Sequence, residues 1–141
     1  MNEQMKIIIV NGVTVVVLCL LLFLASTWWR MSNQYSLGED ALRKGDFPNA
    51  VAGFESAIHM YIPFHPTIEK AAEQLWRIGE NNERLGDIPR ALIAYRALRS
   101  SFYADHWLVT PGESWIARCD KRIAALIPMH HERYNLSLIH I

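Results

Sequence analysis

The hydrophobic positions of this chain form one continuous run near the N-terminus and spaced stripes in the rest of the sequence. Residues 7–29 contain no charged side chain and read IIIVNGVTVVVLCLLLFLASTWW. At a rise of about 1.5 Å per residue, a helix of this length spans roughly 35 Å, which is enough to cross a hydrocarbon core of about 30 Å. Trp28, Trp29 and Arg30 are residue types that favour the membrane boundary. The pattern therefore predicts a single transmembrane helix over residues 7–29, after a short tail of residues 1–6.

A cleaved signal peptide is the alternative interpretation of this segment. Such a peptide has an apolar core of about 7–15 residues and small residues before the cut, whereas this run is longer and residues 25–27 lead into two tryptophans. We therefore expect a retained anchor. The positive-inside rule sets Lys6 against Arg30, Arg43 and Lys44 and favours neither orientation strongly. We expect a bacterial inner-membrane protein of the cell envelope, with a cytoplasmic N-terminal tail and an exported domain.

A repeat with an offset of 41 residues follows the apolar run. Residues 37–58 read LGEDALRKGDFPNAVAGFESAI, and residues 78–99 read IGENNERLGDIPRALIAYRALR. The positions that match without a gap are Gly38 with Gly79, Glu39 with Glu80, Gly45 with Gly86, Asp46 with Asp87, Pro48 with Pro89, Ala50 with Ala91, and Phe54 with Tyr95. The two copies cover about residues 31–65 and 67–103.

Each copy has the pattern of two helices joined by a tight turn. Gly45 and Gly86 suit the left-handed backbone that ends a helix. The following Asp46 and Asp87 suit the N-cap of the next helix, and the proline two residues later falls in its first turn. Beyond each turn, apolar residues recur at i, i+1, i+4 and i+7, which is one face of an amphipathic helix. The pattern predicts an all-α domain built from two helical hairpins.

This combination of residues resembles the tetratricopeptide repeat (TPR). The resemblance rests on a hydrophobic–glycine pair, a second glycine followed by Asp, and then an alanine and an aromatic residue at helical spacing. The family repeats every 34 residues, so an offset of 41 leaves a surplus of 7, which we expect to lengthen the second helix of copy one or the first helix of copy two. The chain departs from the family at Gln34, where tryptophan is common, and at Ala41 and Asn82, where a large aromatic residue is common.

The resemblance implies that the first helix of each hairpin lines a concave groove for a partner peptide or helix. The groove residues that it implies are Tyr35, Glu39, Leu42 and Arg43 from copy one, and Glu73, Trp76, Arg77, Glu80, Glu83 and Arg84 from copy two. Grooves of this family that bind a C-terminal carboxylate use lysine and asparagine at positions where this chain has Tyr35, Trp76, Glu39 and Glu80, so that activity is not expected. An aromatic floor beside carboxylates suits an apolar or basic segment. The alternative is that the charges are solvated helix faces and that Trp76 belongs to the core.

A further helix is expected after the second copy. Thr110 and Glu113 form a capping box with Pro111 at the first helical position, and an apolar stripe extends from Trp115 to Ile127. Ending at Pro128, this capping helix over 111–127 would cover the last hairpin and close a domain of residues 31–128. The tail 129–141 ends in NLSLIHI, which resembles translated sequencing-adapter DNA, so we expect it to lie outside the native fold.

Composition excludes several classes of function. The chain has 14 basic and 14 acidic residues and therefore lacks the positive charge on which nucleic-acid binding depends. No phosphate loop, zinc-spaced Cys/His pattern or nucleophile elbow occurs, so we expect no enzyme, metal, cofactor or small-molecule substrate. Cys119 on the stripe is expected to be a buried apolar residue, and Glu39 and Glu80 are interpreted as one repeated surface position.

The functional hypothesis is a membrane-anchored TPR-like adaptor without catalysis. Its partner would be a protein, which includes a membrane protein or a second copy of the chain, and residues 7–29 would contact the lipid bilayer. The alternative is a small accessory subunit of a larger membrane complex that acts mainly through its transmembrane helix.

Overall fold

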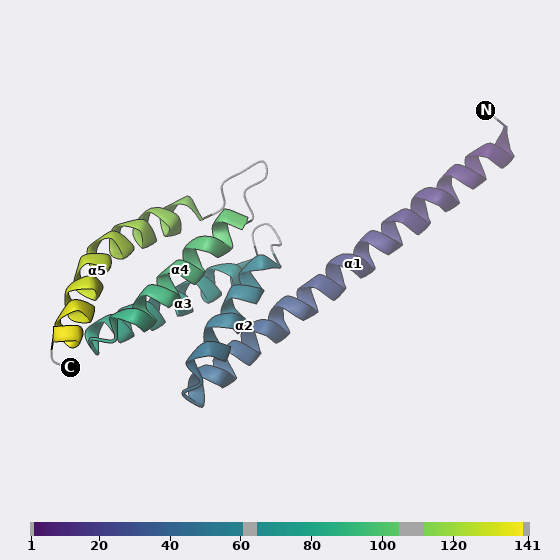
Figure 1. Ribbon diagram of the computed structural model, residues 1–141. Helices are drawn as coiled ribbons and strands as arrows, with labels where there is room; N and C mark the ends of the chain where they lie inside the picture. Colours follow the sequence, from purple (N-terminus) through teal and green to yellow (C-terminus); the bar gives the residue numbers. More distant parts are fainter. Residues whose placement is uncertain (1, 61–64, 105–111, 140–141) are drawn as a thin grey trace.

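The structure, a computed structural model, describes residues 2–60, 65–104 and 112–139, with side chains as far as residue 132. Within these residues every regular element is an α-helix (Figure 1), as the sequence predicts. The helices are α1 (Glu3–Arg43), α2 (Phe47–His59), α3 (Pro66–Arg84), α4 (Ile88–Ala104) and α5 (Glu113–Ile139).

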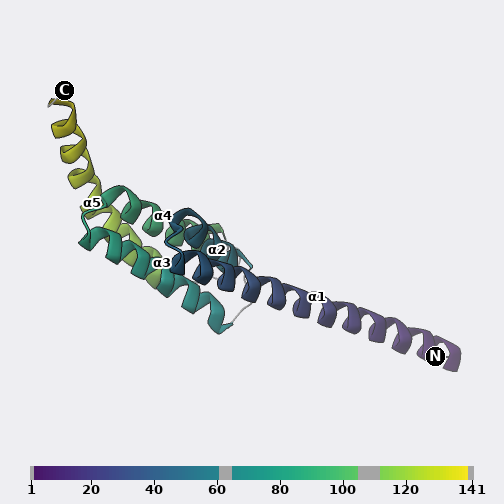
Figure 2. The same ribbon diagram turned by 90° about the horizontal axis from the view of Figure 1, so that it is seen from below.

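The N-terminal part of α1 extends away from the other four helices (Figures 1 and 2). It is long and apolar enough to cross a membrane by length and composition, and its most apolar stretch of 18 residues buries nothing against the rest of the chain. The helix continues without a break for 41 residues. Met31, which follows the predicted span by only two positions, is 0% exposed. The predicted boundary between span and domain is therefore not a joint in the backbone.

The two predicted turns have the same backbone structure. Gly45 and Gly86 adopt φ values of 72° and 74°, in the left-handed region that favours glycine. The N–H groups of Asp46 and Asp87 each donate to the carbonyl five residues earlier at 2.9 Å, which satisfies an otherwise free carbonyl at the helix end. The carboxylates of the same two aspartates accept from the N–H three residues later, at 3.3 and 3.1 Å. The caps predicted from the sequence are therefore confirmed.

The matched glycines on α1 and α3 allow an aromatic side chain of the following helix to pack against the backbone. A Cβ atom added to Gly38 would lie 3.0 Å from the ring of Phe54, and one added to Gly79 would lie 2.5 Å from the ring of Tyr95. Both rings are 0% exposed. The repeated glycine and the repeated aromatic residue thus form the same contact in each hairpin.

A second aromatic pair repeats with the same offset. Tyr35 packs edge-on against Phe54 with the ring centroids 5.5 Å apart, and Trp76 packs against Tyr95 at 4.9 Å. Such pairs contribute about 0.5–1.5 kcal/mol beyond the area that they bury. The first hairpin (α1 and α2) and the second hairpin (α3 and α4) therefore share their closest contacts as well as their turns.

The core is continuous across the two hairpins and α5. Helices α2 and α3 are in contact, and α5 packs on α4. The apolar stripe of α5 contributes Trp115, Ile116, Cys119 and Leu126 as buried residues. The surplus of seven residues was expected to lengthen either α2 or α3. Helix α3 has 19 residues and α2 has 13, so α3 is the longer of the two.

The predicted limits of the last helix are wrong at both ends. Helix α5 begins at Glu113, after Gly112 at φ 72°, and continues through Pro128 to Ile139, so part of the expected tail is helical. Of the predicted capping box, Glu113 is the first residue of α5, while residues 110 and 111 lie outside the described residues. Proline removes one backbone donor and displaces the carbonyl four residues earlier, and a surface helix accommodates this by bending. Figure 2 shows the last turns of α5 angled away from its first turns.

The buried thiol of Cys119 leads to a first prediction. Its side chain is 0% exposed, and burial raises the pKa of this thiol to about 12, so the reactive thiolate is scarce near neutral pH. In a Cys19→Ala chain in detergent, we expect a maleimide reagent at pH 8 to leave the folded protein unlabelled and to label it once guanidinium is added. Rapid labelling of the folded chain, followed by mass spectrometry, would contradict the burial of this side chain.

Candidate interaction surface

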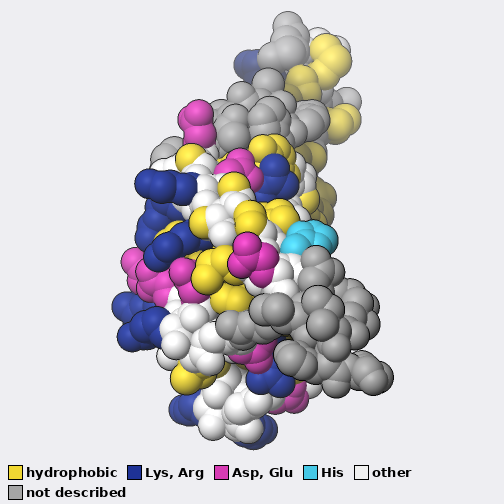
Figure 3. Space-filling view, turned by 60° about the vertical axis from the view of Figure 1, so that its left-hand side comes forward, with side chains coloured by type: hydrophobic (Ala, Val, Ile, Leu, Met, Phe, Trp, Pro, Cys, Tyr) yellow, Lys and Arg dark blue, Asp and Glu magenta, His cyan; other side chains and the backbone are white. Residues whose placement is uncertain are grey.

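The surface implied by the sequence lies on α1 and α3, and α5 packs beside α3. Helix α1 contacts α3, and two side chains of α5 bind residues of α3. Figure 3, which brings the α5 side of the molecule forward, shows acidic and basic side chains close together along one edge, beside apolar ones. The mixture agrees with the neutral charge balance of the chain.

Tyr35 connects α1 with α3 on this surface. Its ring is partly buried against Phe54. Burial raises the pKa of the Tyr35 hydroxyl, a hydrogen bond with Gln74 on α3 opposes that rise, and the nearby carboxylates of Glu39 and Glu73 add to it. Tyr35, Glu39 and Glu73, all predicted as groove residues, are therefore brought together by the structure.

Trp76 is half-buried and packs against three neighbours. Its ring packs against Tyr95 and lies 6.0 Å from the ring of Trp115 on α5. The guanidinium of Arg118 lies over both indole rings, 4.2 Å from Trp76 and 4.3 Å from Trp115. A cation over aromatic faces contributes about 0.5–1 kcal/mol at an exposed site and more where water is excluded. Trp76 therefore packs against the core and stays partly exposed, at the border between the core and the predicted groove.

Glu83 is the most heavily engaged of the predicted carboxylates. It accepts a hydrogen bond of 3.1 Å from the hydroxyl of Tyr95 and lies 3.4 Å from the guanidinium of Arg122 on α5. Burial and this carboxylate raise the pKa of Tyr95 well above its usual range. Glu83 therefore joins α3, α4 and α5, which is a structural role.

A hollow of about 440 Å³ lies beside Glu83. Its lining residues are Glu80, Glu83 and Arg84 of α3 and Arg122 of α5. Two carboxylates and two guanidinium groups give it no excess charge, so it suits a polar segment that carries both charges more than a simple anion or cation.

The remaining predicted groove residues are mostly exposed. Glu73, Arg77 and Arg84 on α3 are exposed to solvent, as are Leu42 and Arg43 at the end of α1. Arg43 forms an ion pair with Asp40 on its own helix, and a pair of this kind contributes little to stability.

Sequence analysis did not identify the contribution of α5 to this surface. Arg118 and Arg122 were not among the predicted surface residues, yet Arg118 lies over Trp76 and Arg122 pairs with Glu83, both on α3. The spacing of Trp115, Arg118 and Arg122 is i, i+3 and i+7, which puts all three on one face of a helix. Trp115 also donates from its indole N–H to the carboxylate of Glu69 at 3.0 Å. The spacing alone indicated that these three residues share one face of α5. That this face packs against α3 could be seen only in the structure.

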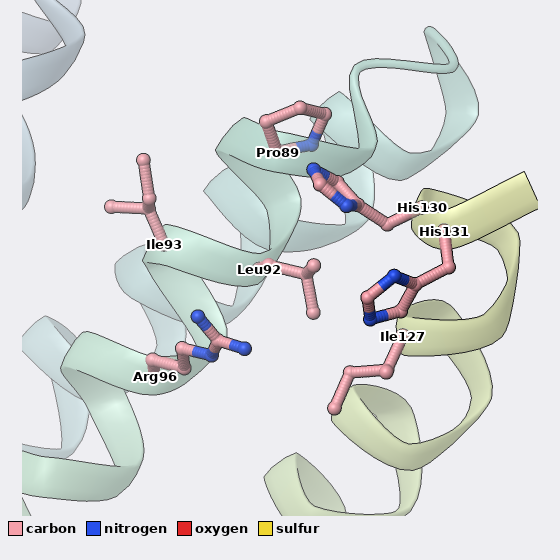
Figure 4. A pocket seen from close by; sticks show the side chains of 7 residues that line it. All are labelled: Pro89, Leu92, Ile93, Arg96, Ile127, His130 and His131. Carbon is pink, nitrogen blue, oxygen red and sulfur yellow. The ribbon is translucent and has the colours of Figure 1, made fainter. Parts of the chain in front are cut away.

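A second hollow of about 440 Å³ lies between α4 and α5 (Figure 4). Its lining residues are Pro89, Leu92, Ile93, Arg96, Ile127, His130 and His131. The two histidines extend from α5 towards the apolar side chains of α4. Among the residues that the structure describes, no group of three or more His, Cys, Asp or Glu side chains is arranged to hold a metal ion. The site has a mixed apolar and cationic lining and shows no arrangement of a nucleophile and a base.

Comparisons of this chain with known protein families, with curated proteins and with solved structures found no match.

Proposed function

We propose that the protein is a single-pass membrane-anchored adaptor, with residues 7–29 as the anchor and residues 31–128 as a TPR-like domain that binds a protein partner without catalysis. The observation that carries the proposal is the dual role of α1. Its N-terminal part leaves large apolar side chains exposed. Its C-terminal part packs as the first helix of the first hairpin, and the second hairpin repeats the same aromatic contact. Exposed apolar area of this extent needs a cover, and a bilayer supplies it.

The interaction surface that we propose lies on the first helix of each hairpin and consists of the half-buried Glu39 and the exposed Glu73, Arg77 and Arg84. Glu39 and Glu73 lie beside half-buried Tyr35, and Arg77 and Arg84 follow on α3, so a partner would meet an aromatic edge together with both signs of charge. Desolvated aromatic groups supply most of the binding energy at such interfaces, and the charges around them select the partner and its orientation. Trp76 takes no direct part in this version of the surface, because Arg118 covers its ring.

Site-directed photo-crosslinking in native membranes tests this proposal. A photoreactive amino acid at Arg77 on the proposed surface is compared with one at Ala52, an exposed position on α2, and with one at Val16 inside the span. We expect a discrete adduct from Arg77 and none from Ala52, and the adduct should persist when residues 7–29 are replaced by an unrelated apolar helix. Both outcomes follow if the partner binds the domain and not the transmembrane helix.

The opposite pattern would identify the accessory-subunit alternative. Adducts from Val16 alone, which disappear when the span is exchanged, would mean that the transmembrane helix makes the specific contact. Equal adducts from Arg77 and Ala52 would contradict a defined surface, since a random collision does not distinguish two exposed positions.

A further inference from the structure

The packed core of the domain begins almost where the predicted span ends. Trp29 is 78% exposed and closes the apolar run, while Met31 is 0% exposed and belongs to the core. Two residues of α-helix correspond to about 3 Å along the axis. The headgroup layer on each side of a bilayer is about 5–7 Å thick, by the difference between the whole bilayer and its hydrocarbon core. A core residue therefore falls within the depth of the headgroups.

The end of the domain near Met31 is formed by several helix termini that lie side by side. Figures 1 and 2 show that the end of α2 and the start of α3 lie towards the projecting part of α1, and the end of α4 lies at the same end of the domain. The ring of Trp28 lies 5.6 Å from the ring of His65, which caps α3 by accepting from the N–H of Thr67 at 3.2 Å. The contact fixes the start of α3 at the level of the interfacial tryptophans.

The described side chains at this end have the character of a membrane boundary. Tyr103, near the end of α4, is 46% exposed, and the guanidinium of Arg99 lies 4.6 Å from the centre of its ring. Aromatic rings with a polar group and arginine side chains with apolar stems are the residue types that accumulate at headgroup level.

We propose that this end of the domain, which contains Trp28, Met60, His65 and Tyr103, docks directly on the lipid surface from which α1 emerges. The inference rests on the proposed function, in that residues 7–29 must span the bilayer. The occupant of this face is the headgroup layer itself, because a continuous helix with no spacer holds the domain against it. Docking depends on this tether and on interfacial aromatic groups, and we expect no requirement for anionic lipid.

The test uses the full chain reconstituted in phosphatidylcholine vesicles. In a Cys19→Ala background, the buried Cys119 stays unlabelled, and single cysteines introduced at chosen positions carry an environment-sensitive fluorophore. Tyr103→Cys and Glu113→Cys report on the proposed docking end, and Val16→Cys reports on the span. Leu85→Cys is the matched control, because it lies beyond the far end of α4, a helix of 17 residues that separates the two ends by about 25 Å.

Lipids with a nitroxide at the headgroup or deep in the acyl chain then locate each fluorophore. We expect the deep nitroxide to quench the fluorophore at Val16→Cys, and the headgroup nitroxide to quench the fluorophores at Tyr103→Cys and Glu113→Cys. The fluorophore at Leu85→Cys should not be quenched by either lipid. Adding phosphatidylserine should leave this quenching unchanged. If Val16→Cys is quenched while Tyr103→Cys and Glu113→Cys respond no more than Leu85→Cys, docking is refuted and the anchor stands. If Val16→Cys is not quenched, the membrane anchor itself is refuted.

Discussion

Replacing Tyr95 with alanine is expected to lower the free energy of unfolding of the domain by about 3–5 kcal/mol. The side chain is 0% exposed and it packs on the backbone of Gly79 and on the ring of Trp76. Removing it leaves a cavity between α3 and α4 and also takes the hydroxyl partner away from Glu83. Because small domains have a total stability of about 5–15 kcal/mol, the loss approaches the limit that the fold can tolerate.

Guanidinium unfolding of the full chain in detergent, followed by tryptophan fluorescence, measures this loss. Tyr95→Phe keeps the ring and removes only the hydrogen bond of 3.1 Å to Glu83, so it should cost about 1 kcal/mol. Leu85→Ala truncates a side chain that is 74% exposed and serves as the control for a truncation at the surface. A loss below about 1 kcal/mol for Tyr95→Ala would contradict a close-packed interface between α3 and α4.

The second large effect is expected from Gly53→Ala in α2. A Cβ atom at this position would lie 2.7 Å from the Cα and the N of Gly38 on α1. Backbone atoms cannot turn aside as a side chain can, so the two helices must separate, and overpacking of this kind costs about 1–3 kcal/mol. Alanine in place of glycine would otherwise favour a helix by up to about 1 kcal/mol. The steric cost should exceed this gain and lower the stability of the domain.

Two glycines of α1 provide the controls for this prediction. Gly12→Ala introduces a Cβ with nothing within 4 Å and should leave the folded domain unchanged. For Gly38→Ala the three atoms nearest to the new Cβ all belong to the ring of Phe54, the closest at 3.0 Å, so this variant should cost less than Gly53→Ala because a side chain can move slightly. The prediction is tested by the same unfolding measurement, and a more stable Gly53→Ala variant would refute the close approach of α1 and α2.

The parts of this fold that were predictable from sequence depend on short-range chemistry. A glycine followed by Asp and a nearby proline determines a helix end, a cap and a helix start within a few residues, and both copies of that turn were found as predicted. The matched pairs of Gly38 with Phe54 and Gly79 with Tyr95 were visible as a repeat, but only the structure shows that each glycine contacts its aromatic residue.

The errors arise where the outcome depends on neighbours that are distant in sequence or on solvent. Pro128 was expected to end α5, since proline disfavours a helix, yet the helix continues past it because a surface helix can bend. The repeat register alone left Trp76 open between a groove and the core, and its contacts with Trp115 and Arg118 depend on the placement of α5. No pattern within α3 carries that information.

The unbroken course of α1 has a consequence for the direction in which the domain faces. A flexible linker would let the domain rotate freely about the membrane normal, but an α-helix transmits rotation about its own axis. Each residue turns the helix by about 100°. The number of residues between the apolar segment and Met31 therefore determines the direction, within the membrane plane, in which each charged side chain of the domain points. A tilt or twist imposed on the buried segment would likewise be felt at the first hairpin as a rigid movement.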